Sequence, residues 1–219
     1  MRLYLHVTGN SKPIPFNYQS YLTGAIHKWL GNNKYHGVLS LYSFSWFENV
    51  IIQKNTGIML NSNSYFFISA FEDNLIKKII KGIMIDPSIY FDSKVADIQI
   101  KDTPAFSSTE KFFIGSPVFI KRRFDNSEKH ITYDHPRCNE YLTETLKKKL
   151  KAANLPSDKV QVKFDPSFIP PKTKIIKYKE ISNRVNICPV TIVGTPEQIG
   201  FAWNVGVGNS TGIGFGALK

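Results

Sequence analysis

The chain has 219 residues and a formal net charge of +11, and 42% of its residues are hydrophobic. This length fits one large domain or two domains of about 100 residues, and the apolar content suffices for a core in each. No apolar run reaches the ~18 residues of a membrane-spanning helix, and the N-terminus enters a strand pattern where a signal peptide would stand. The two cysteines, Cys138 and Cys188, have no ligand-like spacing. We therefore expect a cytoplasmic protein with reduced thiols.

The positive charge is distributed unevenly along the chain. Residues 1–110 carry ten Lys or Arg against eight Asp or Glu, a net charge of +2, whereas residues 111–219 carry eighteen against nine, a net charge of +9. A basic half of this kind favours a polyanionic partner such as nucleic acid, although a merely basic and well-solvated surface would have the same composition.

The first half shows the strand and helix periods of an α+β domain. The predicted elements are a strand at 2–7, a helix from Asn17 to Leu30, a strand from Val38 to Phe47, a hairpin of 58–60 with 65–71, a helix from Glu72 to Asp86, and a strand at 95–100. Their order is the β-α-β-β-α-β order of the ferredoxin-like fold.

The second half repeats this pattern less regularly, after a predicted linker at 102–111. Its predicted elements are a strand from Phe112 to Phe124, a helix from Asn139 to Ala153, strands at 160–164, 175–178 and 185–193, and a helix from Pro196 to Val205 that is capped by Thr195. We expect two tandem ferredoxin-like domains, at 1–101 and 112–219.

The last fourteen residues, from Gly206 to Lys219, contain five of the fourteen glycines. The polar residues 209–211 predict a loop tip, and the alternation after them predicts a final strand with one bare face. Such a face would admit the close approach of a phosphate backbone to Gly208, Gly212 and Gly214. A plain C-terminal hairpin fits the same residues. A P-loop does not, because no Gly-Lys-Ser or Gly-Lys-Thr follows.

This end of the chain carries Gly-x-Gly, a short polar loop and then Gly-x-Gly-Phe-Gly. The motif resembles the signature of the CRISPR-associated repeat-RNA endoribonucleases, the Cas6 family of the RAMP superfamily. The segments Met1–Val7 and Ile14–His27 are similar to that family's first strand and first helix. The resemblance covers both ends of the chain. It implies an endoribonuclease that cuts precursor CRISPR RNA once per repeat without a metal or other cofactor. It also implies repeat RNA as the partner of a monomer or homodimer, with other proteins of an interference complex as further candidate partners.

Two histidines are candidate catalytic residues. His27 lies on the polar side of the first predicted helix with Ser20 and Thr23, and His36 lies in the loop that follows. Ordinary exposed histidines would fit both positions. In the resembled family the general base is usually a histidine in or just after the first helix, which implies this role for His36 and a supporting role for His27. Some members also use a lysine beyond the loop histidine. No lysine lies between His36 and Lys54, so that role is unassigned, and Lys28 and Lys34 are the remaining candidates.

Histidine suits the chemistry that the resemblance implies. RNA supplies its own nucleophile, because a base that removes the 2′-OH proton lets this oxygen attack the adjacent phosphorus, and an acid then protonates the leaving 5′-oxygen. The reference pKa of histidine, about 6.5, fits both roles at neutral pH. The products would be a 2′,3′-cyclic phosphate, or its opened form, and a 5′-OH.

Basic residues cluster at two places in the second half. Lys121, Arg122 and Arg123 end a predicted strand, and Lys172 and Lys174 have the even spacing that places both on one face of an extended segment. Contacts of this kind position RNA by its phosphates, but a solvated strand face would look the same. A third cluster, at Lys147–Lys149 and Lys151, is expected on the solvent face of its helix.

Two other functions fit the same residues. The chain could be a non-catalytic RNA-binding subunit of a RAMP-type ribonucleoprotein complex, or an unrelated basic module that binds nucleotides or DNA. Retained repeat binding without cleavage would indicate the first, and equal affinity for duplex DNA and repeat RNA would indicate the second.

Overall fold

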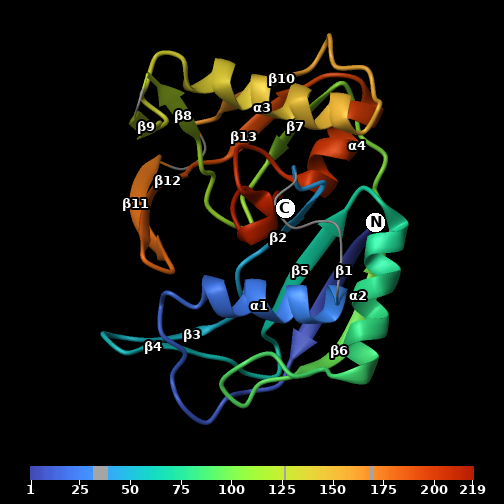
Figure 1. Cartoon of the computed structure of the whole chain (residues 1–219), viewed down its shortest axis with the longest axis vertical. Helices are drawn as coiled ribbons and strands as arrows, with labels where there is room; N and C mark the ends of the chain where they lie inside the picture. Colours follow the sequence, from blue (N-terminus) through green and yellow to red (C-terminus); the bar gives the residue numbers. More distant parts are fainter. Residues whose placement is uncertain (32–38, 126, 168–169) are drawn as a thin grey trace.

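The computed structural model describes residues 1–31, 39–125, 127–167 and 170–219. The chain forms an α+β protein with two halves, which lie one above the other in Figure 1 with the N-terminal half below. Within the described ranges, no helix has the length and apolarity that crossing a membrane requires.

The first half contains one four-stranded antiparallel sheet with the strand order β2-β5-β1-β6. Its strands are β1 (Arg2–Val7), β2 (Tyr42–Phe44), β5 (Tyr65–Ala70) and β6 (Val95–Lys101). The alternation in β1 buries Leu3, Leu5 and Val7 in a core with the apolar residues of two helices. The order of these strands along the chain and in the sheet is that of a ferredoxin-like domain, as predicted.

Two helices, α1 (Gln19–Leu30) and α2 (Asp73–Ile85), contribute the helical side of this core. They lie close together because Gly82 has no side chain: a Cβ atom there would stand 2.2 Å from the carbonyl oxygen of Trp29. Both helices match the predicted ranges to within about two residues, because each has an apolar stripe at helical spacing.

The predicted hairpin of 58–60 with 65–71 is wrong. The strand β4 (Gly57–Met59) pairs with β3 (Ile51–Gln53), whereas β5 pairs with β1 and β2. Ile14 and Ile58 also exchange backbone hydrogen bonds, which hold β4 away from the main sheet. The β3–β4 hairpin is thus an insertion between β2 and β5.

The second half contains a three-stranded sheet with the order β10-β13-β7, built from β7 (Thr109–Phe112), β10 (Gln161–Phe164) and β13 (Val190–Val193). A bridge between Ile114 and Leu218 adds a minimal fourth strand beside β7. The helices α3 (Cys138–Ala152) and α4 (Pro196–Val205) pack into the same core. Two hairpins extend from this unit: β8 (Lys121–Phe124) with β9 (Ser127–His130), and β11 (Lys172–Tyr178) with β12 (Ile181–Ile187).

Several predicted strands of the second half are divided by proline. The strand predicted from Phe112 to Phe124 is interrupted between β7 and β8, where Pro117 lacks the N–H that a ladder needs. Pro189 separates β12 from β13 in the same way. The first residues of β7 fall within the predicted linker, and the domain boundaries stay a prediction. The cap of α4 is confirmed, since Thr195 Oγ1 accepts a hydrogen bond from the Gln198 N–H at 3.3 Å.

A buried arginine ties the two halves together. Arg2 is 1% exposed and donates to the carbonyl oxygens of Trp203 and Leu218, at 3.0 and 2.7 Å. Its guanidinium lies over the rings of Phe67 and Trp203, at 3.9 and 3.5 Å from their centroids. Burial lowers the pKa of Arg2 to about 10, so the group stays charged at neutral pH. The first strand therefore binds both α4 and the last residues of the chain.

Candidate nucleic-acid interface

The glycine-rich segment, defined here as residues 206–216, lies between the two halves (Figure 1, red, beside the label C). The predicted final strand is present only at its end, where Leu218 forms a bridge with Ile114, and the glycine-rich segment itself is a looped chain with one short 3-10 helix, η1 (Thr211–Ile213). Positive φ angles explain this shape, because Gly206, Gly208, Ser210, Gly214 and Gly216 all lie between +60° and +87°. A strand cannot pass through so many left-handed positions.

The expected bare face is also wrong, because the glycines are packed against protein. Gly208, Gly212 and Gly214 are all buried. A Cβ atom would stand 2.5 Å from the Phe119 carbonyl oxygen at Gly208, 2.2 Å from Ser40 Oγ at Gly212, and 2.7 Å from the Phe44 ring at Gly214. The glycines thus permit close packing between the halves, and their contact with RNA stays a prediction.

Three successive carbonyl groups of the glycine-rich segment accept hydrogen bonds from side chains of the first half. The Tyr42 hydroxyl donates to Gly212 O at 3.0 Å, Gln19 Nε2 to Ile213 O at 2.5 Å, and Trp46 Nε1 to Gly214 O at 2.9 Å. All three donors come from α1, β2 or the residues just after β2. The segment is therefore held on the surface of the first half by specific polar contacts.

The second half holds the same segment from the other side. Asn209 Oδ1 accepts from the Lys121 N–H at 3.0 Å, which attaches the segment to β8. Lys149 is 1% exposed, and its Nζ donates to Thr211 Oγ1 at 2.9 Å. The prediction that Lys149 lies on the solvent face of its helix is wrong, although its neighbour Lys148 is exposed as expected.

His27 lies in the last turn of α1, with a half-buried side chain. Thr23, on the same side of the helix, is 4% exposed. This side is thus more enclosed than the sequence predicted. Gln19, two turns earlier, contacts the glycine-rich segment, so α1 is oriented by that segment. His36 lies outside the described residues, as does Lys34. Lys28 forms an ion pair with Asp86 at 2.8 Å, beyond the end of α2.

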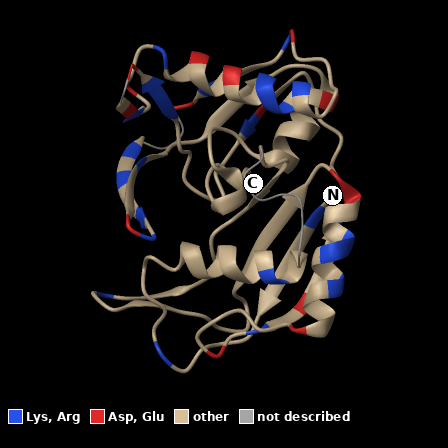
Figure 2. Ribbon diagram, viewed as in Figure 1, with Lys and Arg blue, Asp and Glu red and all other residues tan. Residues whose placement is uncertain are grey.

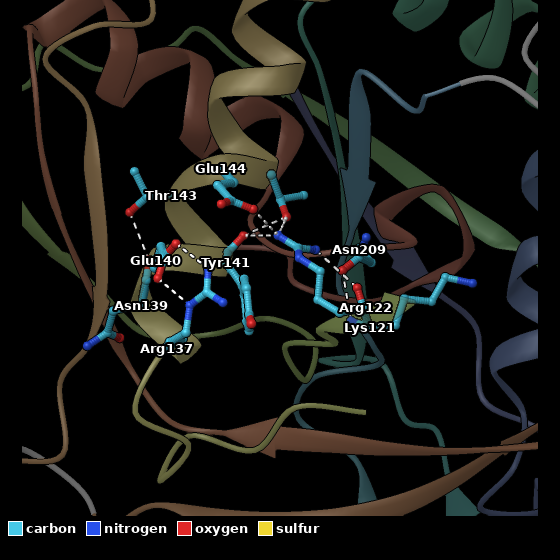
Figure 3. A network of polar contacts seen from close by, with 10 residues as sticks. Lys121, Arg122, Arg137, Asn139, Glu140, Tyr141, Thr143, Glu144 and Asn209 are labelled. Carbon is cyan, nitrogen blue, oxygen red and sulfur yellow. Dashed lines mark hydrogen bonds and ion pairs between the residues drawn. The ribbon is translucent and has the colours of Figure 1, made fainter. Parts of the chain in front are cut away.

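The basic residues of β8 have three different surroundings. Arg123 is exposed, and Lys121 forms an ion pair with Glu128 at 2.9 Å. The guanidinium of Arg122 turns toward α3, as Figure 3 shows, and donates to Tyr141 O at 2.7 Å and to Glu144 at 3.1 Å. Arg122 therefore anchors the β8–β9 hairpin on α3, whereas Arg123 is exposed and its contact with RNA stays a prediction.

The β11–β12 hairpin covers the glycine-rich segment. Ile176 and Val185 pack with Phe215 and Phe119 in a small core, and Lys172 and Lys174 are exposed on the β11 strand as predicted. The Arg184 N–H donates to His130 Nδ1 at 3.1 Å, which joins this hairpin to β9. The two hairpins are thus neighbours, and Figure 2 shows Lys and Arg (blue) on both β8 and β11.

Arg184 and Lys149 belong to this arrangement but were not among the site residues predicted from the sequence. Arg184 is exposed on β12 opposite Ile175, so it lies on the face of the hairpin away from Lys172 and Lys174. Only the pairing register, which follows from the fold, shows this. Helical spacing could have indicated Lys149, which lies on the buried side of α3 with Leu142, Thr145 and Leu146.

No group of three or more His, Cys, Asp or Glu side chains in the described part of the chain is arranged to hold a metal ion. The geometry offers a half-buried histidine on the first half, exposed cations on the second, and a segment that is hydrogen-bonded to both. Such an arrangement can hold an extended polyanion across the two halves, with an acid–base group beside it.

Comparisons with known proteins agree with this architecture. The protein named CRISPR-associated endoribonuclease Cas6 1 from Methanocaldococcus jannaschii is 25% identical, over all of this chain and 92% of that protein. A Cas6-related protein from Pyrococcus furiosus has a similar structure, with a TM-score of 0.85 at 20% identity over all of this chain and 97% of that one. A structure described as a RAMP protein binding different RNA substrates gives 0.84 at 18% identity, over 100% and 98% of the two chains. At these identities the two structures establish the ferredoxin-like RAMP fold.

The second half gives the most specific match. The family model described as CRISPR associated protein Cas6, C-terminal, matches residues 99–219, which include both basic hairpins, α3, α4 and the whole glycine-rich segment. Since this match covers more than half of the chain and the fold agrees over its full length, the chain belongs to the Cas6 family.

Proposed function

We propose that this protein is an endoribonuclease that binds the repeat RNA of precursor CRISPR transcripts and cuts it once per repeat. The match of the Cas6 C-terminal model to residues 99–219 carries this proposal, because that range holds the basic hairpins and the glycine-rich segment. The relative from M. jannaschii is itself named a CRISPR-associated endoribonuclease.

Repeat RNA would lie along the β8–β9 and β11–β12 hairpins. Arg123, Lys172 and Lys174 are exposed there, so each can approach a phosphate at little cost in desolvation. Arg122 would act indirectly, because its hydrogen bonds to α3 fix the hairpin that carries Arg123. Affinity would come mostly from phosphate contacts and would fall as salt rises.

Cleavage would use the substrate's own 2′-OH as the nucleophile. One histidine removes the 2′-OH proton, the oxygen attacks the adjacent phosphorus, and a second group returns a proton to the leaving 5′-oxygen. His27 and His36 are the proposed groups, and His27 is held by a helix that the glycine-rich segment orients. A positioned acid or base of this kind typically contributes about 10²- to 10⁴-fold in rate.

The test is incubation of the protein with the repeat RNA of its own host in EDTA, followed by mapping of the product ends. We expect a single cut per repeat, a 2′,3′-cyclic phosphate or its opened form on one product, and a 5′-OH on the other. A 5′-phosphate product, or cleavage that stops in EDTA, would contradict the mechanism. Tight repeat binding without any cut would instead indicate the non-catalytic subunit of a RAMP complex.

A further inference from the structure

Lys149 occupies a position that is unusual for a lysine. It lies near the end of α3 and is 1% exposed, whereas Lys148 beside it is exposed. A buried ammonium group is costly unless its N–H groups are all hydrogen-bonded. Burial lowers the pKa of Lys149 to about 7.

The three donors of Lys149 have three acceptors. Nζ donates to Val205 O at 2.9 Å, to Gly206 O at 3.2 Å and to Thr211 Oγ1 at 2.9 Å. The two carbonyl groups end α4, where the helix dipole favours a positive charge. The hydroxyl group belongs to η1, inside the glycine-rich segment. Lys149 therefore joins α3, the end of α4 and the segment at one point.

The residues just after Thr211 contact the first half. Gly212, Ile213 and Gly214 accept hydrogen bonds from Tyr42, Gln19 and Trp46 through their carbonyl groups. A shift at Thr211 would therefore move these contacts, and with them α1, which carries His27. We propose that Lys149 is a positioning residue, whose buried amino group holds Thr211 and so sets the glycine-rich segment and α1 relative to the basic hairpins.

This proposal rests on the proposed function, since it assigns Lys149 a part in aligning RNA between two halves. In-line attack is sensitive to alignment. A mutation far from the reacting atoms that misplaces them by about 1 Å can lower the rate about 100-fold.

The experiment compares two disruptive variants with two matched controls. Lys149→Met keeps the volume but removes the donors, and Thr211→Val keeps the shape but removes the hydroxyl acceptor. Lys148→Met removes a neighbouring exposed lysine, and Thr211→Ser retains the hydroxyl. Each protein is measured for amide hydrogen exchange across 206–216, for repeat-RNA affinity, and for the single-turnover rate of cutting bound RNA.

We expect Lys149→Met and Thr211→Val to speed amide exchange in the segment and to slow cutting of bound RNA by about 10- to 100-fold, with affinity within a few-fold. Thr211→Ser and Lys148→Met should match the unmodified protein in all three measurements. Unchanged exchange in Lys149→Met, or faster exchange with an unchanged cutting rate, would overturn the positioning role while leaving the proposed function standing. If the unmodified protein cuts no repeat RNA, the proposed function fails. The role in catalysis falls with it, and the exchange data then decide only whether Lys149 holds the segment.

Discussion

Gly214 gives the sharpest test of how the glycine-rich segment is built. Its φ is +87°, and a Cβ atom would stand 2.7 and 2.8 Å from two atoms of the Phe44 ring and 3.2 Å from Gln19 Cγ. Gly214→Ala should therefore add two costs. The left-handed conformation costs an alanine about 1–2 kcal/mol, and overpacking a buried contact costs about 1–3 kcal/mol. We expect the free energy of unfolding to fall by about 2–5 kcal/mol.

The assay is urea unfolding of Gly214→Ala in two backgrounds, the unmodified chain and Phe44→Leu. Shortening the ring at residue 44 should relieve the clash but not the backbone strain, so the cost of the alanine should drop to about 1–2 kcal/mol there. Gly24→Ala is the control, because Gly24 lies in the interior of α1 with only an ordinary contact to Tyr90 at 3.8 Å, and it should gain up to about 1 kcal/mol. An equal cost of Gly214→Ala in both backgrounds would refute the packing argument.

Three further predictions concern charge and catalysis. Relative to Lys149→Met, the unmodified protein should gain stability as pH rises above about 7, by about 1.4 kcal/mol per pH unit. The reason is that the unfolded chain keeps the lysine proton up to the ordinary pKa of 10.5, whereas the folded chain has already lost it. A stability difference between the two proteins that stays the same from pH 7 to pH 9 in chemical unfolding would exclude this. Arg123→Ala should reduce the salt slope of RNA binding by about one unit without affecting stability. Arg122→Ala should cost about 1–3 kcal/mol of stability, because it loses the hydrogen bonds to α3. Salt titrations and unfolding curves of both variants test this, and a reduced salt slope for Arg122→Ala with a loss of stability for Arg123→Ala would contradict it. His27→Ala should slow single-turnover cutting about 100-fold or more with affinity within a few-fold, and a full rate would remove His27 from the mechanism.

The sequence was most informative where a local pattern decides the structure. Apolar stripes predicted α1 and α2, and the Thr195-Pro196 start predicted α4 with its cap. The glycine motif and the two N-terminal elements predicted the Cas6 family, which the family match confirms. These features depend on residues that are close in sequence, so their period and spacing are visible without the fold.

The sequence was least informative where two distant segments meet. The sequence predicts an open strand for the glycine-rich segment. The residues that pack against it, Phe44 and Ser40, are more than 160 residues away along the chain, so the sequence does not reveal these contacts. The helical spacing of Lys149 indicates the buried side of α3, but its hydrogen bond to Thr211 joins two elements that are distant in the sequence. The prolines that divide the second half are visible in the sequence, but the hydrogen bonds between Ile14 and Ile58 join segments that lie 44 residues apart.

The contribution of the 2′-OH group is the most direct test of the account. A repeat RNA with a single 2′-deoxy nucleotide at the mapped cut site differs from the natural substrate only by the nucleophile. We predict that the protein binds this RNA within a few-fold of the natural repeat and leaves it intact under conditions in which the natural repeat is cut completely. Cleavage of the deoxy substrate at the same position would show that another nucleophile acts, and would contradict the proposed mechanism.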